Sequence, residues 1–384
     1  MRIIVTGLIG QYPFGGVIWD YIQYVTGFRK LGYDVLYLED TGVWPYDPIK
    51  ETVTDDCSYQ VSALKNIMDS FDLGDRWVYR NAADNTFHGA GESIAREWLK
   101  SADLLVNVST ASWLEDYDIG VKHQMFIDGD PLFTQIGLLD GNNSSYAERL
   151  RAHDSHFSFG LNLGNPGCQV PKTGIQWRPT LQPVDLDYWT FEDQPGSNEF
   201  TTVMNWVSYP PKEWDGKSFG QKDVEFLRFI ELPQKTPQSF TIAMGQGIGK
   251  TRPTKHIQDC GWSIVEPDQV LPDHKTYHEF LSRSRAEWSI AKEAYVKADT
   301  GWFSCRTACY LAAGRPGLVQ DTGWTKHLPH GDGLLSFNTL SECLDGIESI
   351  NRDYDQHRRA ARKFAETYLD ATKVCHDLIE QAQV

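Results

Sequence analysis

The feature that most constrains the fold is an alternation of short apolar runs with a segment of helical period, starting at the N-terminus. A helix is predicted at residues 18–31, and strands at 3–5, 34–38, 104–108 and 125–127. Apolar runs of this length suit buried strands, and strands that alternate with helices form a parallel sheet covered by helices on both faces. The N-terminal half is therefore predicted to be a parallel α/β domain.

A second series of the same kind follows a stretch rich in Gly, Pro and Trp. Strands are predicted at 200–207, 239–244, 262–265 and 317–320, and helices at 307–313 and 340–350. A chain of 384 residues is long enough for two cores. We therefore predict an α/β fold of two tandem Rossmann-like domains that face a cleft, at residues 1–180 and 181–354, with a closing helix at 355–384.

Charge and cysteine usage exclude some classes of protein. The formal net charge of -16 opposes a broad nucleic-acid surface, because phosphate binding needs a basic stripe. The seven cysteines lack the spacing of a zinc site, so we expect reduced thiols. No run of about 18 apolar residues and no signal-peptide pattern is present, so a cytoplasmic protein without a membrane span is expected.

Two nucleotide-binding motifs are matched incompletely. VTGLIGQYP resembles the TGxxGxxG opening of short-chain dehydrogenases and epimerases, but Pro13 takes the place of the third glycine. The Tyr-xxx-Lys spacing of that family occurs at Tyr46 and Lys50, in a Pro-rich loop. MGQGIGKT is one residue shorter than a P-loop, and Pro253 stands where its helix would begin. We therefore reject both motifs, although Lys250 and Arg252 remain candidates for a place near a nucleotide.

Four segments, in order, resemble the retaining glycosyltransferases of the GT-B fold, the family that includes glycogen-synthase-like and sucrose-synthase-like enzymes. They are GGV with the later LGYDVLYLE, GKSFGQKD, FTIAMGQG, and CYLAAGRPGLVQDTGW with its following GLL. The resemblance covers the C-terminal half and residues 1–40. It implies a GT-B fold and the transfer of a sugar from a nucleotide-sugar.

The resemblance also implies which residues hold the diphosphate of the donor. Gly15 and Gly16 would let backbone amides approach it, although a tight strand–helix turn explains the same glycines. The spacing favours Lys217 and Lys222 as the groups that neutralise its charge as the sugar leaves, and a solvated surface pair is the alternative. Gly245 belongs to the glycine turn after a predicted strand. SYPPKEWD separates the preceding strand from the lysine loop, which is a departure from the family.

The start of the helix near residue 307 is a further predicted donor contact. Ser304 or Thr307 would cap the helix and leave its amides to a phosphate, and Arg306 would add a bidentate contact. An ordinary capped helix with an exposed arginine is the alternative.

The family carries two glutamates near this helix, eight residues apart. Gly301 and Cys309 occupy those positions here. Asp299 and Asp321 are nearby substitutes, and Asp321 is included among the predicted donor-binding residues.

Asp128 and Asp130 follow a predicted buried strand, at the carboxyl end where α/β sheets bind ligands. We predict that they are the catalytic pair, with one aspartate as general base for the acceptor hydroxyl. Two alternatives are the cation-binding D-x-D of GT-A enzymes and a turn in which both carboxylates bond to backbone amides before Pro131. Further candidates are Asp20, His153 and His156.

These observations predict a glycosyltransferase that needs no metal and no cofactor beyond its nucleotide-sugar co-substrate. The acceptor is unidentified, and a small molecule or glycan is favoured over nucleic acid because of the acidic charge. The alternatives are a nucleotide-sugar 2-epimerase of the same fold, a non-catalytic nucleotide-sugar-binding protein, and a glucosyltransferase acting on modified bases in DNA.

Overall fold

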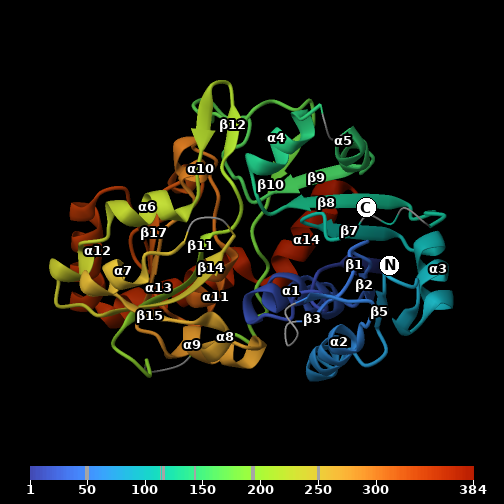
Figure 1. The fold of residues 1–384 in the computed structure, drawn as a ribbon, viewed down its shortest axis with the longest axis horizontal. Helices are drawn as coiled ribbons and strands as arrows, with labels where there is room; N and C mark the ends of the chain where they lie inside the picture. The colour runs from blue at the N-terminus through green and yellow to red at the C-terminus, as the bar shows by residue number, and fades with distance from the viewer. Residues whose placement is uncertain (48–51, 113, 115–116, 142–143, 192–194, 249–250) are drawn as a thin grey trace.

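The computed structural model describes residues 1–47, 52–112, 114, 117–141, 144–191, 195–248 and 251–384. Two sheets lie side by side, each with helices on its faces (Figure 1). The fold is therefore the predicted α/β fold with two Rossmann-like units.

The first sheet has the strand order β10-β9-β8-β7-β1-β2-β5-β6, and only its edge pair β5–β6 is antiparallel among the described pairs. Its strands are β1 (Arg2–Thr6), β2 (Asp34–Glu39), β5 (Trp77–Arg80), β6 (Phe87–Gly89), β7 (Leu104–Val108), β8 (His123–Asp128), β9 (Ser155–Ser158) and β10 (Trp177–Pro179). A two-stranded hairpin, β3 (Tyr46–Asp47) and β4 (Thr52–Val53), lies beside it.

The second sheet has the order β15-β14-β11-β16-β17-β18, with parallel pairing throughout its described strands. Its strands are β11 (Phe200–Val207), β14 (Phe240–Gly247), β15 (Ser263–Val265), β16 (Ala286–Ser289), β17 (Gly317–Gln320) and β18 (Leu334–Phe337). The central strands of both sheets are almost fully buried, as expected for strands covered on two faces.

The helices follow the strands in α/β order. Those of the first half are α1 (Gly15–Lys30), α2 (Ser58–Ser70), α3 (Glu92–Ser101), α4 (Phe133–Leu139) and α5 (Ser144–Arg151). Those of the second half are α6 (Lys222–Arg228), α7 (Thr254–Asp259), α8 (Pro267–Val270), α9 (His274–Arg283), α10 (Glu293–Lys297), α11 (Cys305–Ala312), α12 (Leu340–Arg352), α13 (Tyr354–Phe364) and α14 (Ala371–Ala382). Short 3-10 turns at Leu232–Gln234 and Trp324–Lys326 and a π-helical turn at Ala365–Leu369 complete the set.

The C-terminal helices connect the two halves. Helix α13 packs on α11 of the second half, whereas α14 packs on α1 of the first. Between them the chain pairs with the connection that joins the two sheets: Val184 N donates to Leu369 O at 2.7 Å, and Ala371 N donates to Val184 O at 2.9 Å. The C-terminus consequently lies beside the first sheet (Figure 1).

The structure corrects one region of the sequence analysis. The stretch that aligned with a phosphate-binding loop forms an antiparallel hairpin, β12 (Lys212–Trp214) and β13 (Lys217–Phe219), which projects above the junction of the two sheets (Figure 1). Its two loop residues, Asp215 and Gly216, have φ angles of 48° and 70°. Positive φ at both positions is the hairpin turn that an Asp-Gly pair favours, so the sequence did contain the signal.

Among the residues that the structure describes, no helix has both the length and the hydropathy needed to cross a membrane.

Candidate active site

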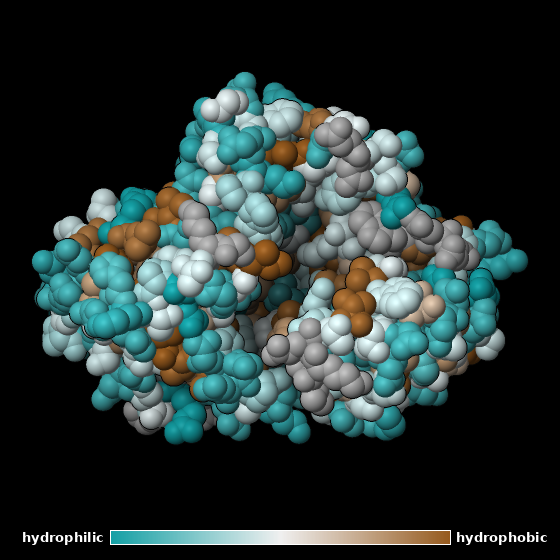
Figure 2. Space-filling view, in the orientation of Figure 1, coloured by the Kyte–Doolittle hydropathy of each residue, from teal (hydrophilic) through white to brown (hydrophobic). Residues whose placement is uncertain are grey.

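Two adjoining cavities open into the hollow between the two sheets (Figure 2). The α1 cavity, about 600 Å³, lies between the start of α1 and the ends of β11, β14 and β15. The β8 cavity, about 470 Å³, lies against the loops that follow β7 and β8. Asp20 and Cys305 line both cavities and so mark their junction. Both volumes are in the range of small-molecule sites.

The α1 cavity brings together four of the predicted donor-binding residues, namely Gly15, Gly16, Gly245 and Arg306. Gly15 has a packing reason of its own. A Cβ atom there would lie 2.3 Å from Cβ of Tyr277 and 2.5 Å from the carbonyl oxygen of Asp273, both on or beside α9. The glycine therefore lets the first helix of one half contact the other half directly.

Arg306, on the first turn of α11, is a fixed cation in the wall of the α1 cavity. Its guanidinium donates to Oε1 of Glu287 at 2.7 Å, to the carbonyl of Val203 at 2.6 Å and to Oγ of Ser289 at 2.5 Å. The side chain is therefore held by neighbours rather than exposed as an ordinary surface arginine. A charge held in this way is already oriented when a ligand arrives.

Neither Ser304 nor Thr307 caps the start of α11 through its hydroxyl group, as the structure describes it. Ser304 occupies the N-cap position but makes no side-chain capping bond, and the buried hydroxyl of Thr307 has no hydrogen-bond partner among the described residues. The first backbone amides of α11 consequently receive no cap from Ser304, which keeps them available to an anion.

Asp20 is the carboxylate at the junction of the two cavities. It lies on the second turn of α1. Burial raises the pKa of Asp20 to about 6, while a hydrogen bond with the thiol of Cys305 and the charge of Arg306 act in the opposite direction. Asp20 was only a further candidate from the sequence, because nothing in the chain indicates which side of α1 faces the cleft.

Lys222, the first residue of α6, lines the β8 cavity close to the junction. Among the described residues its ammonium has no hydrogen bond and no ion pair. Burial, and then the charges of Arg306 and Lys292, hold the pKa of Lys222 well below its ordinary value. An anion bound beside this lysine would supply the missing opposite charge and favour its protonated form.

Asp128 and Asp130 both line the β8 cavity, but their surroundings differ. Asp128 is buried and accepts four hydrogen bonds, from Oγ1 of Thr134 (2.6 Å), the amide of Asp130 (2.9 Å), Nε2 of Gln135 (3.0 Å) and Oγ of Ser158 (2.8 Å). Burial nevertheless raises the pKa of Asp128. The turn proposed as an alternative is thus present at Asp128, and its carboxylate organises the loop after β8.

Asp130 belongs to a cluster, here called the clasp, that joins the two halves. Nζ of Lys292 lies 2.9 Å from Oδ1 of Asp130, and the hydroxyls of Tyr209 and Tyr295 also donate to that carboxylate. The same ammonium lies 4.2 to 5.1 Å from the ring centres of Tyr209, Tyr295 and Phe133. Burial lowers the pKa of Lys292 despite the nearby carboxylate. Sequence reasoning missed Lys292, because no motif surrounds it.

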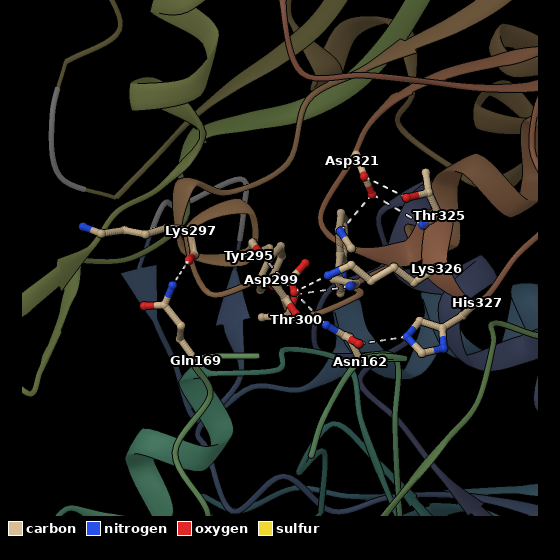
Figure 3. Close-up of polar contacts among 12 residues, drawn as sticks. Asn162, Gln169, Tyr295, Lys297, Asp299, Thr300, Asp321, Thr325, Lys326 and His327 are labelled. Carbon is tan, nitrogen blue, oxygen red and sulfur yellow. Dashed lines mark hydrogen bonds and ion pairs between the residues drawn. The ribbon is translucent and has the colours of Figure 1, made fainter. Parts of the chain in front are cut away.

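Five predicted or substitute residues line neither cavity: Ser304 and Thr307, described above, and Lys217, Asp299 and Asp321. Lys217 is exposed on the β12–β13 hairpin, where it donates to Oε1 of Gln169 at 2.8 Å. Asp321 accepts bonds from the amide of Gly323 and the hydroxyl of Thr325, and so organises its own turn (Figure 3).

Asp299 belongs to the second half and contacts Asn162 of the first half. It pairs with Lys326 at 2.5 Å and accepts a bond from Nδ2 of Asn162 at 2.9 Å (Figure 3). The structure therefore does not bring Lys217, Asp299 or Asp321 to the cavities.

The remaining candidates are held by local contacts. The ring of His153 contacts the carbonyls of Arg149 and Leu150, and burial lowers the pKa of His153 to about 4. His156 contacts the Leu150 carbonyl at 2.7 Å. Arg252 pairs with Glu266 at 2.5 Å, and Glu266 lines the α1 cavity. Lys250 lies outside the described residues.

Solved structures similar to this chain are glycosyltransferases, although no protein-family model and no curated protein matches its sequence. An alpha-glucosyltransferase in complex with UDP and a 13-mer DNA has a TM-score of 0.59 at 13% identity and covers 100% of both chains. Sucrose-phosphate synthase from Thermosynechococcus elongatus has a TM-score of 0.53 at 9% identity, over 100% of this chain and 98% of that one. AviGT4, a glycosyltransferase of avilamycin A biosynthesis, has a TM-score of 0.53 at 11% identity, over 100% and 97%.

The class that these similarities define is the GT-B fold over the full length of the chain. At this level of identity the likeness concerns the fold, and the activity has to be argued from the site.

Proposed function

We propose that the protein is a glycosyltransferase that moves a sugar from a nucleoside-diphosphate sugar to an acceptor bound in the β8 cavity. The observation that carries the proposal is the junction of the two cavities. There a carboxylate with a pKa of about 6 faces the same space as a lysine that has no partner among the described residues. A base and a cation are what group transfer from an anionic donor requires.

The nucleoside belongs in the α1 cavity and the diphosphate at its boundary with the β8 cavity. Arg306 and Lys222 stand on the two sides of that boundary, and the uncapped start of α11 faces it. These groups would carry the charge of the leaving diphosphate, so the proposed mechanism assigns no step to a metal ion. The similar structures with bound UDP make a uridine nucleotide the first to test.

Asp20 is the proposed general base. Its carboxylate is ionised above about pH 6 and lies where a sugar on the diphosphate would meet an acceptor hydroxyl. The acceptor oxygen attacks the anomeric carbon, its proton passes to Asp20, and the bond from that carbon to the diphosphate breaks. Contact between the halves through Gly15 and the clasp would exclude water and so limit hydrolysis of the donor.

The test is titration of the protein with UDP, GDP, ADP and dTDP by calorimetry, followed by turnover of the matching nucleotide-sugar. We expect one nucleoside diphosphate to bind in the micromolar range, and Lys222→Met to weaken that binding. The proposal would be rejected if none of the four nucleotides bound and if no nucleoside diphosphate were released from their glucose conjugates. Turnover that converts the donor sugar without an acceptor would instead establish the 2-epimerase.

Transfer to a modified DNA base is the second candidate, because the alpha-glucosyltransferase with bound DNA is among the similar structures. The net charge of -16 opposes it. Its test is a DNA-binding isotherm at several salt concentrations. Protein that contacts phosphates loses affinity steeply as salt rises, and an absence of binding at low salt would leave the small-molecule or glycan acceptor.

A further inference from the structure

We propose that Cys305 is a positioning residue whose thiol donates a hydrogen bond to Asp20 and holds that carboxylate at the junction of the two cavities. The inference rests on the proposed function, because it assigns Asp20 the role of base. No family motif predicts it, since the resemblance assigns its functional side chains to Ser304, Arg306 and Thr307 and its glutamates to the positions of Gly301 and Cys309.

The geometry places the two side chains together across the cleft. Asp20 comes from α1, which follows the first strand of the first sheet, and Cys305 is the first residue of α11 in the second half. Both line the α1 cavity and the β8 cavity. Of the seven cysteines, Cys305 and Cys168 are partly exposed, whereas the other five are buried. Cys305 is therefore part of the cavity wall, unlike a cysteine that only fills a core.

The electrostatics of the pair are reciprocal. The hydrogen bond from the thiol acts to lower the pKa of Asp20, against the effect of burial. Burial and the charge of Asp20 raise the pKa of the Cys305 thiol well above its ordinary value, so the thiol stays protonated and remains a donor. The other titratable groups that face the pair from the surrounding helices are Tyr21, Tyr24, Lys222, Tyr277, Arg306 and Cys309.

The Cys305 thiol would affect catalysis through the protonation state of Asp20. An incoming diphosphate brings negative charge to Lys222 and Arg306, close to Asp20, and a nearby negative charge raises the pKa of a carboxylic acid. The hydrogen bond from Cys305 opposes that rise. The thiol would thus keep Asp20 ionised near neutral pH while the donor is bound.

The first arm of the test compares the pH dependence of turnover in Cys305→Ala, Cys305→Ser and Cys168→Ser. Cys305→Ala should shift the acidic limb of kcat upward by about one pH unit, a tenfold loss of kcat on that limb, with KM for the donor changed less than threefold. Serine also donates a hydrogen bond, so the acidic limb of kcat in Cys305→Ser should lie at the same pH as in the unsubstituted protein. Cys168→Ser is the matched control outside both cavities. An identical acidic limb in all variants would overturn the proposal.

The second arm needs no turnover. Iodoacetamide alkylates a thiolate: the sulfur bonds to the methylene carbon, iodide leaves, and the thiol proton goes to solvent. Mass spectrometry then gives the alkylation rates of Cys305 and Cys168 in the same protein at pH 8. Asp20→Asn removes the charge that suppresses the thiolate, so Cys305 should react about tenfold faster while Cys168 is unchanged.

The two arms separate the two ideas. If Cys305 were alkylated at the same rate in the unsubstituted protein and in Asp20→Asn, the proposed hydrogen bond would be rejected, whether or not the protein turns over a nucleotide-sugar. A faster rate in Asp20→Asn, in a protein that turns over no nucleotide-sugar, would support the hydrogen bond and reject the proposed function.

Discussion

Two combinations of a lysine and an aspartate line the β8 cavity, and they differ in whether the lysine and the aspartate bond to each other. In the clasp, Lys292 and Asp130 bond to each other, and two tyrosine hydroxyls also donate to the carboxylate. At the junction, Lys222 has no partner among the described residues, and Asp20 is held by the thiol hydrogen bond proposed above. Satisfied charges stabilise one arrangement of the two halves, whereas unsatisfied charges favour a ligand that supplies the missing partner. We therefore infer that the clasp stabilises the contact between the two halves, whereas the junction binds the donor and carries the reaction.

The largest expected effect comes from Asp20→Asn. Loss of a general base lowers kcat by about 100- to 10,000-fold, whereas UDP should bind no more weakly, because the substitution removes a negative charge beside the diphosphate. Steady-state release of UDP from UDP-glucose, together with calorimetry, measures both quantities. A comparable loss of kcat in Asp130→Asn, with its folded state intact, would break the contrast between the two aspartates.

Lys222→Met should weaken the binding of UDP by about 10- to 100-fold, because a charged hydrogen bond to an anion contributes about 1.5–3 kcal/mol. Isothermal titration at low ionic strength measures the change. Lys217→Met is the matched control, since that lysine is exposed on the hairpin and outside both cavities. An equal loss in both variants would show that the hairpin moves to the donor in solution.

Lys292→Met should act on stability rather than on nucleotide binding. It leaves the Asp130 carboxylate without its cation, at an expected cost of about 2 kcal/mol, less than for a fully buried pair because that carboxylate is 34% exposed. Thermal unfolding of Lys292→Met should show a lower midpoint. The double variant Asp130→Asn with Lys292→Met should regain part of the lost midpoint. If the two single changes simply add in the double variant, the clasp is not a coupled pair.

The smallest expected effect is the pH dependence of stability at Asp20. The ordinary pKa of 3.8 rises to about 6 on folding, so the folded protein holds this proton more tightly than the unfolded chain. The contribution to stability is full below about pH 4 and is lost as pH rises through 6. Asp20→Asn should therefore raise the melting midpoint by about 2–4 °C at pH 8 and leave it unchanged at pH 4. A midpoint raised equally at both values would contradict the raised pKa.

Local sequence was sufficient for most of the secondary structure. The strands predicted at 200–207 and 317–320 form with those bounds as β11 and β17. The helix predicted from residue 18 begins at Gly15, because the glycines before it are already helical. Periodicity and apolar runs reflect burial on each element, and burial is a property that neighbouring residues share.

The hairpin and the candidate site required more than local pattern. GKSFGQKD matched the spacing of a family loop, yet the turn at Asp215-Gly216 pairs β12 with β13 and places Lys217 outside the site. Lys222 was predicted and lines the cavity, because it begins the helix that follows. A spacing alone does not distinguish these two outcomes.

The alternation of elements, and with it the α/β class and the glycine-rich loop that opens α1, can be read from the chain alone. Which charged groups meet depends on the three-dimensional packing. Asp20 and Cys305 are 285 positions apart, and Asp130 and Lys292 are 162 apart. Their neighbours are set by how two sheets and a returning C-terminal helix pack, and packing over such separations leaves no periodic trace in the chain.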